Sequence, residues 1–203
     1  MHMTNALLIF IRNPELGKVK TRLARTLGDD EALRIYHVLL EKTRLAALDV
    51  QASRWLFYSN IVEDQDDWPN PDFIKTTQSP GDLGERMEAA FKQVFEQGAS
   101  KALIIGSDCP ELNGPVLQQA FDLLDEYDFV IGPVPDGGYY LLGMKQLQSN
   151  LFYDIAWSTE TVRASTITKI EEARRTYVLL PMLRDIDEAS DWQAYITPSQ
   201  SSR

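Results

Sequence analysis

Residues 101–110 read KALIIGSDCP, an apolar run followed by glycine, serine, aspartate, cysteine and proline. Such a run, stopped by a proline, is typical of a strand buried on both faces of a parallel sheet, and we expect that strand at 101–107. Asp108 would then lie at the strand's carboxyl end, where ligands of open α/β sheets bind. A carboxylate there can hold a hard cation that bridges phosphate oxygens, although an aspartate after a strand also commonly forms a turn or caps a helix.

Strand-like and helix-like segments alternate on both sides of this run, which is the pattern of an α/β fold. We expect further strands at 5–12, 54–59, 73–77, 129–134, 139–144 and 177–180. We expect helices at 30–48, between a loop at 78–83 and Gly98, and at 113–127, 158–174 and 189–196. No repeat, linker or low-complexity segment interrupts the pattern, so the sequence predicts one domain over 1–203, with a frayed end at 198–203.

The composition excludes several classes of function. The chain has 203 residues, 44% of them hydrophobic, and its longest apolar runs are too short to cross a bilayer. A net charge of -10 argues against binding to nucleic acid or to anionic membranes, which need a basic surface. One cysteine, Cys109, can form neither an intramolecular disulfide nor a cysteine-based zinc site, and the first residues show no export signal. We therefore expect a cytoplasmic protein.

A basic segment follows the first predicted strand. Arg12 ends that strand, and Lys18, Lys20 and Arg22 place three cations within five residues of an otherwise acidic chain, next to a loop that contains Gly17. Several donors in one place suit an oxyanion such as a phosphate. A solvated basic turn is the alternative, but the position at a strand's carboxyl end favours ligand binding.

A glycine-rich turn, PDGGY at 135–139, lies between two predicted strands. Gly137 and Gly138 would let a ligand approach the backbone closely, and Asp136 could act as a base or orient a sugar hydroxyl. A simple hairpin turn explains the same residues equally well.

Three shorter segments are weaker candidates. Asp185 and Asp187 would face the same way in an extended segment, where Asp185 could be a second metal ligand and Asp187 the cap of the last helix. Gly81 and Asp82 precede a helix, whose first N–H groups could hold a base or phosphate, or Asp82 could simply start that helix. Trp157 could line a ligand pocket or pack in the core.

Taken in order, these segments resemble one family, the DUF2064 glycosyltransferase-like proteins, also described as radical-SAM/selenodomain-associated transferases and connected with arsenosugar biosynthesis. The resemblance runs from about residue 6 to residue 192. The segments that carry it are 18–22 (KVKTR), 81–87 (GDLGERM), 107–110 (SDCP), 135–139 (PDGGY) and 157–159 (WST).

The family is similar to nucleotide-diphospho-sugar transferases of the GT-A fold and to the guanylyltransferases of molybdenum-cofactor and deazaflavin-cofactor synthesis. This implies a three-layer α/β sandwich with a mostly parallel sheet of about seven strands. It also implies a Mg²⁺ or Mn²⁺ ion on Asp108, phosphate contacts from Lys18 and Arg22, and an acceptor side at 136–139. Ser107 and Asp108 replace a full Asp-x-Asp motif, which leaves the second metal ligand open.

The resemblance predicts a metal-dependent glycosyltransferase with a nucleotide-diphospho-sugar donor and a small-molecule acceptor. A divalent cation together with Lys18, Lys20 and Arg22 would stabilise the charge on the leaving diphosphate. A nucleotidyltransferase that releases pyrophosphate is the enzymatic alternative, although the loop at 13–17 is poorer in glycine than is usual for such enzymes. A non-catalytic nucleotide-binding protein is the third possibility.

Overall fold

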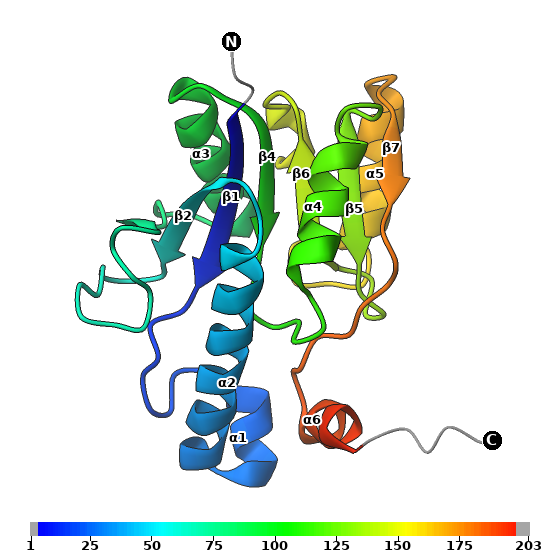
Figure 1. Cartoon of the computed structure of the whole chain (residues 1–203). Helices are drawn as coiled ribbons and strands as arrows, with labels where there is room; N and C mark the ends of the chain where they lie inside the picture. The colour runs from blue at the N-terminus through cyan, green and yellow to red at the C-terminus, as the bar shows by residue number, and fades with distance from the viewer. Residues whose placement is uncertain (1–3, 198–203) are drawn as a thin grey trace, which may run out of the picture.

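Seven apolar segments form one sheet in the computed structural model, which describes residues 4–197. They are β1 (Thr4–Ile11), β2 (Ser53–Tyr58), β3 (Ile74–Thr77), β4 (Ala99–Ile105), β5 (Phe129–Pro133), β6 (Tyr139–Met144) and β7 (Tyr177–Leu179). The strand order is β3-β2-β1-β4-β6-β5-β7 (Figure 1). Only β6 runs antiparallel to its neighbours, β4 and β5. The predicted mostly parallel, seven-stranded sheet is confirmed.

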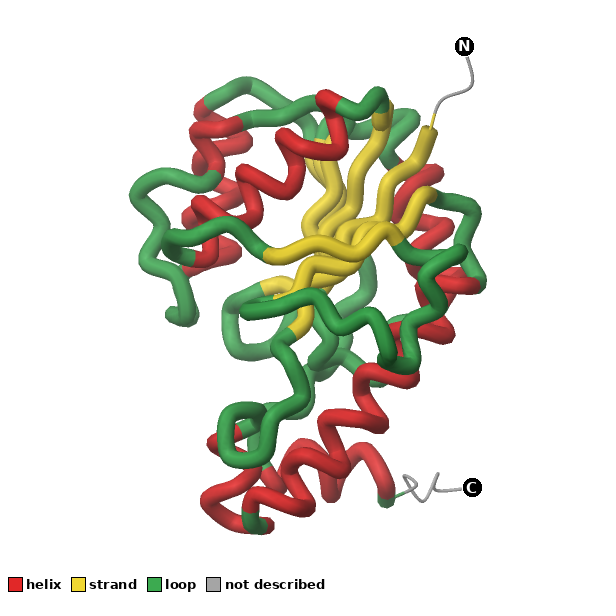
Figure 2. The backbone as a smooth tube through the Cα atoms, turned by 90° about the vertical axis from the view of Figure 1, so that its left-hand side faces the viewer, coloured by secondary structure: helices red, strands yellow, loops and turns green. Residues whose placement is uncertain are grey.

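Helices cover both faces of this sheet and make the predicted three layers (Figures 1 and 2). They are α1 (Thr21–Leu27), α2 (Asp29–Leu48), α3 (Leu83–Glu96), α4 (Gly114–Leu123), α5 (Val162–Glu172) and α6 (Ala189–Ile196), with one 3₁₀ turn at Ser149–Leu151. α2 and α4 pack on one face, and α3 and α5 pack on the other.

The inner strand β1, next to the central strand β4, shows why the sheet is buried on both sides. Leu7 and Ile9 face the layer of α2 and α4, whereas Ala6 and Leu8 face the layer of α3 and α5. All four side chains are fully buried. Burying a leucine or isoleucine contributes about 1.5–3 kcal/mol, so a run without polar residues is favoured at this central position.

A third apolar cluster lies beyond the carboxyl edge of the sheet. It joins α1, the first half of α2 and α6 through Leu23, Ile35, Leu39, Ile186 and Trp192. We call these three elements the helical projection, and Figures 1 and 2 show that it extends past the ends of the strands. The projection brings the chain after β1 next to the chain after β7.

Most predicted element boundaries agree with the structure to within two residues. α1 was not predicted, because its seven residues are too few to show a helical period. α5 begins at Val162 and not at Ser158, since Ser158 has a φ of 63°, which is incompatible with a helix. α4 ends at Leu123 and not near Tyr127.

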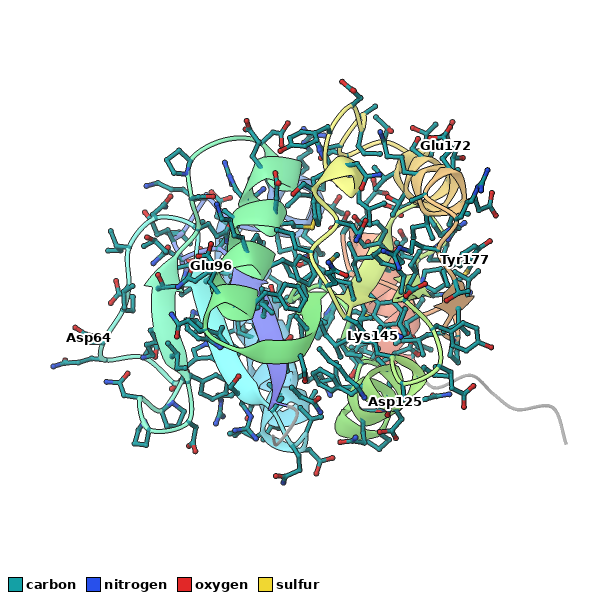
Figure 3. All side chains as sticks on the ribbon, turned by 90° about the horizontal axis from the view of Figure 1, so that it is seen from above. Asp64, Glu96, Asp125, Lys145, Glu172 and Tyr177 are labelled. Carbon is teal, nitrogen blue, oxygen red and sulfur yellow. The ribbon has the colours of Figure 1, made fainter. Side chains whose placement is uncertain are left out.

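The opposite edge of the sheet carries exposed acidic side chains. Figure 3 looks onto this edge from above and labels Glu96, Asp125 and Glu172, which are exposed. None of the helices between residues 4 and 197 has the length and apolar composition that a bilayer span requires. The predicted fraying at 198–203 lies outside the described residues.

Candidate functional site

The parallel topology places the predicted site segments at one edge. β1, β4, β5 and β7 all end there, so the loops at 12–20, 106–110, 134–138 and 180–188 meet beyond the sheet. Backbone hydrogen bonds fix the last of these loops across the edge. The N–H of Leu183 donates to the carbonyl of Pro133 (3.2 Å), and the N–H of Ile186 donates to the carbonyl of Asp108 (2.8 Å).

Lys20 is the centre of the charged groups at this edge. Its Nζ lies 2.5 Å from Oδ1 of Asp108 and 3.3 Å from Oδ1 of Asp187, and it donates to the carbonyl of Ile186 at 2.6 Å. The Lys20 side chain is only 6% exposed, whereas the two carboxylates are 49% and 39% exposed. Nη1 of Arg22 lies 3.4 Å from Oδ2 of Asp187. The site is therefore a buried cation under partly open carboxylates.

Asp185 adds a further carboxylate beside this pair. Burial, followed by the charges of Asp187, Asp136 and Asp108, raises the pKa of Asp185 to about 6. Among residues 4–197, no lysine or arginine forms an ion pair with Asp185. The carboxylates at this edge therefore carry more negative charge than the nearby cations neutralise.

Tyr36 of α2 contacts the chain at the carboxyl ends of β1 and β4, next to the site. Its hydroxyl donates to the carbonyl of Arg12 (3.0 Å) and accepts from the Arg12 N–H (2.9 Å), and it also lies 3.5 Å from Oγ of Ser107. Burial raises the pKa of Tyr36 to about 12, so the hydroxyl stays neutral. Tyr36 links the ends of β1 and β4, a role that its place on an apolar helix face did not reveal.

Two buried or half-buried amides hold the loops after β1, β2 and β3, and sequence reasoning missed both. Oδ1 of Asn13 accepts from the N–H of Asn60 (3.0 Å), and Nδ2 of Asn13 donates to the carbonyl of Ile61 (2.8 Å). Nε2 of Gln78 donates to the carbonyls of Ile11 and Phe57, each at 3.1 Å. A single amide in a polar loop gives no periodic signal from which such a role could be predicted.

The predicted basic segment divides into separate environments. Lys20 and Arg22 reach the carboxylates, but Lys18 is 67% exposed and pairs with Glu15 at 2.5 Å. Arg12 is exposed beside the same loop. The prediction that Asp187 caps α6 is wrong. Glu188 and Asp191 form the capping box of that helix, and Asp187 instead binds Lys20 and Arg22.

The glycine-rich turn at 135–139 is a hairpin that joins β5 to β6, as the simpler of its two interpretations predicted for the backbone. Oδ1 of Asp136 accepts from the N–H of Gly138 at 2.9 Å. Gly137 has a φ of 91°, and a Cβ there would lie 2.0 Å from the carbonyl oxygen of Glu160. Gly137 is therefore required for the hairpin to pack against the chain before α5.

Tyr139 points away from the edge. Its hydroxyl is enclosed beside Thr166 of α5, and burial raises its pKa. Cys109 is also buried, and burial raises the pKa of its thiol to about 12, as expected for a packing residue.

The loop at 78–83 leads into α3, and Asp82 starts this helix as its cap. Asp82 caps the helix by accepting from the N–H of Glu85 (2.9 Å), and the Glu85 side chain accepts from the N–H of Asp82 (2.8 Å). Gly81 is exposed and has a φ of 115°. Trp157 packs against this helix start, because a Cβ on Gly84 would lie 2.5 Å from its Nε1.

The carboxylates have the chemistry of a Mg²⁺ or Mn²⁺ site, since hard cations prefer oxygen ligands. Between residues 4 and 197, however, no three histidine, cysteine, aspartate or glutamate side chains are gathered closely enough to hold a metal ion. A hollow of about 270 Å³ lies between α1 and α6 and includes Arg22. Another, of about 510 Å³ between α2 and α4, includes none of the predicted site residues.

Comparisons with known proteins agree with this architecture. Residues 43–159 match the family model "Uncharacterized protein conserved in bacteria (DUF2064)". A candidate nucleotide-diphospho-sugar transferase from Desulfovibrio desulfuricans G20 is 32% identical, with a TM-score of 0.90 over 98% of this chain and 90% of that one. No curated protein matches the chain.

Two more distant solved structures share the fold. One is 4-diphosphocytidyl-2C-methyl-D-erythritol synthase from Anaerococcus prevotii, with 11% identity, a TM-score of 0.60 and 96% of each chain covered. The other is a Mycobacterium tuberculosis H37Rv protein in complex with manganese, with 12% identity, a TM-score of 0.53, and 96% and 98% of the chains covered.

Proposed function

Since this chain belongs to the bacterial DUF2064 family, we propose that it is a metal-dependent glycosyltransferase. It would move a sugar from a nucleotide-diphospho-sugar donor to a small-molecule acceptor. The observation that carries the proposal is the meeting of Lys20 and Arg22 with the carboxylates of Asp108 and Asp187 at the carboxyl edge of the sheet, where the negative charge of these aspartates also reaches Asp185.

The carboxylates would hold the divalent cation. Asp108 follows the central strand β4, and Asp185 lies next to it without a cationic partner among the described residues. When bound, the ion would neutralise negative charge on the departing diphosphate. The homologous fold has been solved with manganese in the mycobacterial protein, which supports the choice of ion without identifying its ligands here.

Basic side chains would hold the phosphate oxygens. Arg22 is 62% exposed and lies beside Asp187, so its guanidinium can turn to a ligand without losing a buried contact. Arg12 and Lys18 lie exposed on the same loop and are the remaining candidates for phosphate binding. The exposed turn at Gly81 and Asp82 is the candidate contact for the rest of the nucleotide.

The hairpin would bind the acceptor. Asp136 is exposed, and as a base it would accept the proton of the attacking hydroxyl if the anomeric configuration inverts. Gly138 would let a ligand approach the backbone, whereas the space beside Gly137 is filled by Glu160 and is closed to a ligand. Because the Tyr139 hydroxyl is enclosed beside Thr166, Tyr139 would hold the hairpin in place by packing and would not donate to the acceptor. Trp157, packed at the start of α3, is the candidate apolar wall.

Nucleotidyl transfer is the alternative, because a cytidylyltransferase from Leptospira borgpetersenii shares the fold. It would release pyrophosphate from a nucleoside triphosphate, whereas glycosyl transfer releases a nucleoside diphosphate from the donor. The products therefore separate the two reactions.

The test is a panel of UDP-sugars, GDP-sugars and nucleoside triphosphates, each added with and without Mn²⁺. Thermal shift reports binding, because a ligand of the folded state raises its melting temperature. We expect stabilisation that needs both Mn²⁺ and the diphosphate, and release of nucleoside diphosphate once a panel of small hydroxylated acceptors is added to take the sugar. Pyrophosphate release would establish nucleotidyl transfer instead, and binding without any product would favour a non-catalytic protein.

A further inference from the structure

Lys20 has the surroundings of a bound cation. Its ammonium group contacts three oxygens, Oδ1 of Asp108, the carbonyl of Ile186 and Oδ1 of Asp187, at 2.5, 2.6 and 3.3 Å. These oxygens come from the chain after β4 and the chain after β7. An ammonium group has three protons to donate, so the three contacts use its full capacity.

The backbone at Lys20 supports the same view. Lys20 has φ 46° and ψ 45°, a left-handed conformation that residues with side chains adopt rarely. Such conformations persist where the surrounding structure fixes them, and they gather at functional sites. Here the conformation directs a long side chain inward from the loop before α1, until it is 6% exposed.

We propose that the Lys20 ammonium is a built-in counter-cation that competes with the divalent cation for Asp108. In the ligand-free protein it pairs with Asp108 and Asp187. When metal and nucleotide bind together, the metal takes the carboxylate and Lys20 moves to the diphosphate. This rests on the proposed function, which supplies the metal and the diphosphate as ligands.

Competition follows from the positions of the charges. The ammonium lies in contact with Oδ1 of Asp108, and a metal ion bound to either oxygen of that carboxylate would be close enough for the two cations to repel each other. A divalent ion brings two positive charges to the neighbouring carboxylates, whereas one ammonium brings a single charge.

Exchange also requires a new partner for Lys20. A buried ammonium without a partner is unfavourable, so metal alone has to displace Lys20 at a cost. A diphosphate offers oxygens to the same ammonium and removes that cost. Metal and nucleotide should therefore raise each other's affinity, and thermodynamic linkage requires that the factor be the same in both directions.

The first experiment measures Mn²⁺ binding by the electron paramagnetic resonance signal of the free ion. Lys20→Met should bind Mn²⁺ about tenfold more tightly than the wild type without nucleotide, because the competitor is gone. UDP or GDP should strengthen Mn²⁺ binding in the wild type and much less in Lys20→Met. Lys101→Met is the matched control, since it also removes a buried, ion-paired ammonium, and it should leave Mn²⁺ affinity unchanged.

Two results would overturn the proposal in distinguishable ways. If wild type and Lys20→Met bind Mn²⁺ equally, competition is wrong while the proposed metal-dependent function stands. If neither binds Mn²⁺, with or without a nucleoside diphosphate, both the competition and the metal-dependent function are wrong.

A second experiment uses the unaltered protein and does not depend on a folded variant. Nitrogen-15 spectra of the lysine ammonium groups report buried ion pairs, and Lys75 and Lys101 are internal references because they pair with Asp66 (2.6 Å) and Asp125 (2.7 Å). Adding Mg²⁺ with UDP or GDP should shift the Lys20 signal and leave the other two in place. An unchanged Lys20 signal at saturation would refute the exchange.

Discussion

The two ends of β4 hold the same kind of ion pair in different surroundings. At the start of the strand, Lys101 lies 2.7 Å from Oδ1 of Asp125 and donates to the carbonyl of Phe121 at 2.8 Å. Beyond its other end, Lys20 lies 2.5 Å from Oδ1 of Asp108. Both lysine side chains are buried, with 8% and 6% exposed.

The difference lies in the charges around each pair. Lys101 has one carboxylate partner, and that carboxylate, Asp125, is 59% exposed to water. Lys20 has two partners, and a third carboxylate, Asp185, is near enough to them for its pKa to rise. Like charges held together in a partly buried place are typical of functional sites, because folding alone gains nothing from them. We therefore interpret the first pair as structural and propose that the second is prepared for a ligand.

The largest expected effect is on catalysis. Asp108→Ala should lower turnover of the donor found in the nucleotide panel by at least about 100-fold. The metal ion that stabilises the leaving diphosphate would lose the carboxylate that holds it. Asp125→Ala removes the partner of Lys101 at the other end of the strand and should leave turnover unchanged. The same two variants should differ in thermal shift, where only Asp108→Ala loses the Mn²⁺-dependent part. Unchanged Mn²⁺ dependence in Asp108→Ala would show that the metal assignment is wrong.

The next effect concerns glycines at the two edges of the sheet. Gly137, in the hairpin at the site, and Gly98, just before β4, have φ values of 91° and 92°. Gly98→Ala should cost about 1–2 kcal/mol for the left-handed backbone, since a Cβ there meets nothing within 4 Å.

Gly137→Ala should cost about 1–3 kcal/mol more, for the contact with Glu160. Urea unfolding of both variants gives the difference directly. Equal losses of unfolding free energy in the two variants would mean that the hairpin can shift away from the chain before α5 without a cost in stability.

Much of the fold could be predicted because it depends on long apolar patterns. The run at 101–107 and the strand at 5–12 are buried on both faces, and each agrees with a strand of the structure to within two residues. The helical projection could not be predicted. Its core depends on Leu23 and Ile186, which lie 163 residues apart and carry no shared local pattern.

The site could be predicted only as a set of strand ends. The sequence placed Asp108 and the basic segment at the carboxyl ends of strands and indicated Asp185 as one candidate for the second metal ligand. In the structure Lys20 and Arg22 reach the carboxylates, whereas Lys18 pairs with Glu15. The sequence could not indicate which cation reaches Asp108, since the inward course of Lys20 depends on a left-handed backbone and on the chain after β7. For the same reason Asp187 was assigned to a helix cap, although it binds Lys20.

A smaller effect should appear in the pH dependence of stability. The pKa of Asp185 is about 6 in the folded protein, against 3.8 as its ordinary value. The folded state therefore holds this proton more tightly than the unfolded state, and Asp185 should reduce stability as pH rises from about 4 through 6. In metal-free buffer, Asp185→Asn should raise the free energy of unfolding at pH 8 by about 1 kcal/mol, a value reduced for solvent screening, and have little effect at pH 4.

Asp125→Asn is the control for that measurement, because its carboxylate is open to water at the other edge. Its effect should not change between pH 4 and pH 8 in the way that Asp185→Asn does. A gain from Asp185→Asn that is the same at both pH values would show that packing, and not charge, is responsible.

The smallest effect tests how the site is held. Tyr36→Phe removes the hydroxyl that links Arg12 to Ser107 and should cost about 1 kcal/mol of stability, the usual contribution of such a hydrogen bond. Tyr177→Phe removes an exposed hydroxyl near the opposite edge, 3.3 Å from Glu171, and should cost much less. If Tyr36 positions Asp108 through the end of β4, Tyr36→Phe should also weaken Mn²⁺ binding in the presence of nucleotide, whereas Tyr177→Phe should not. A loss of stability with unchanged Mn²⁺ affinity would limit Tyr36 to a structural role, because the end of β4 would then keep its place without the hydroxyl.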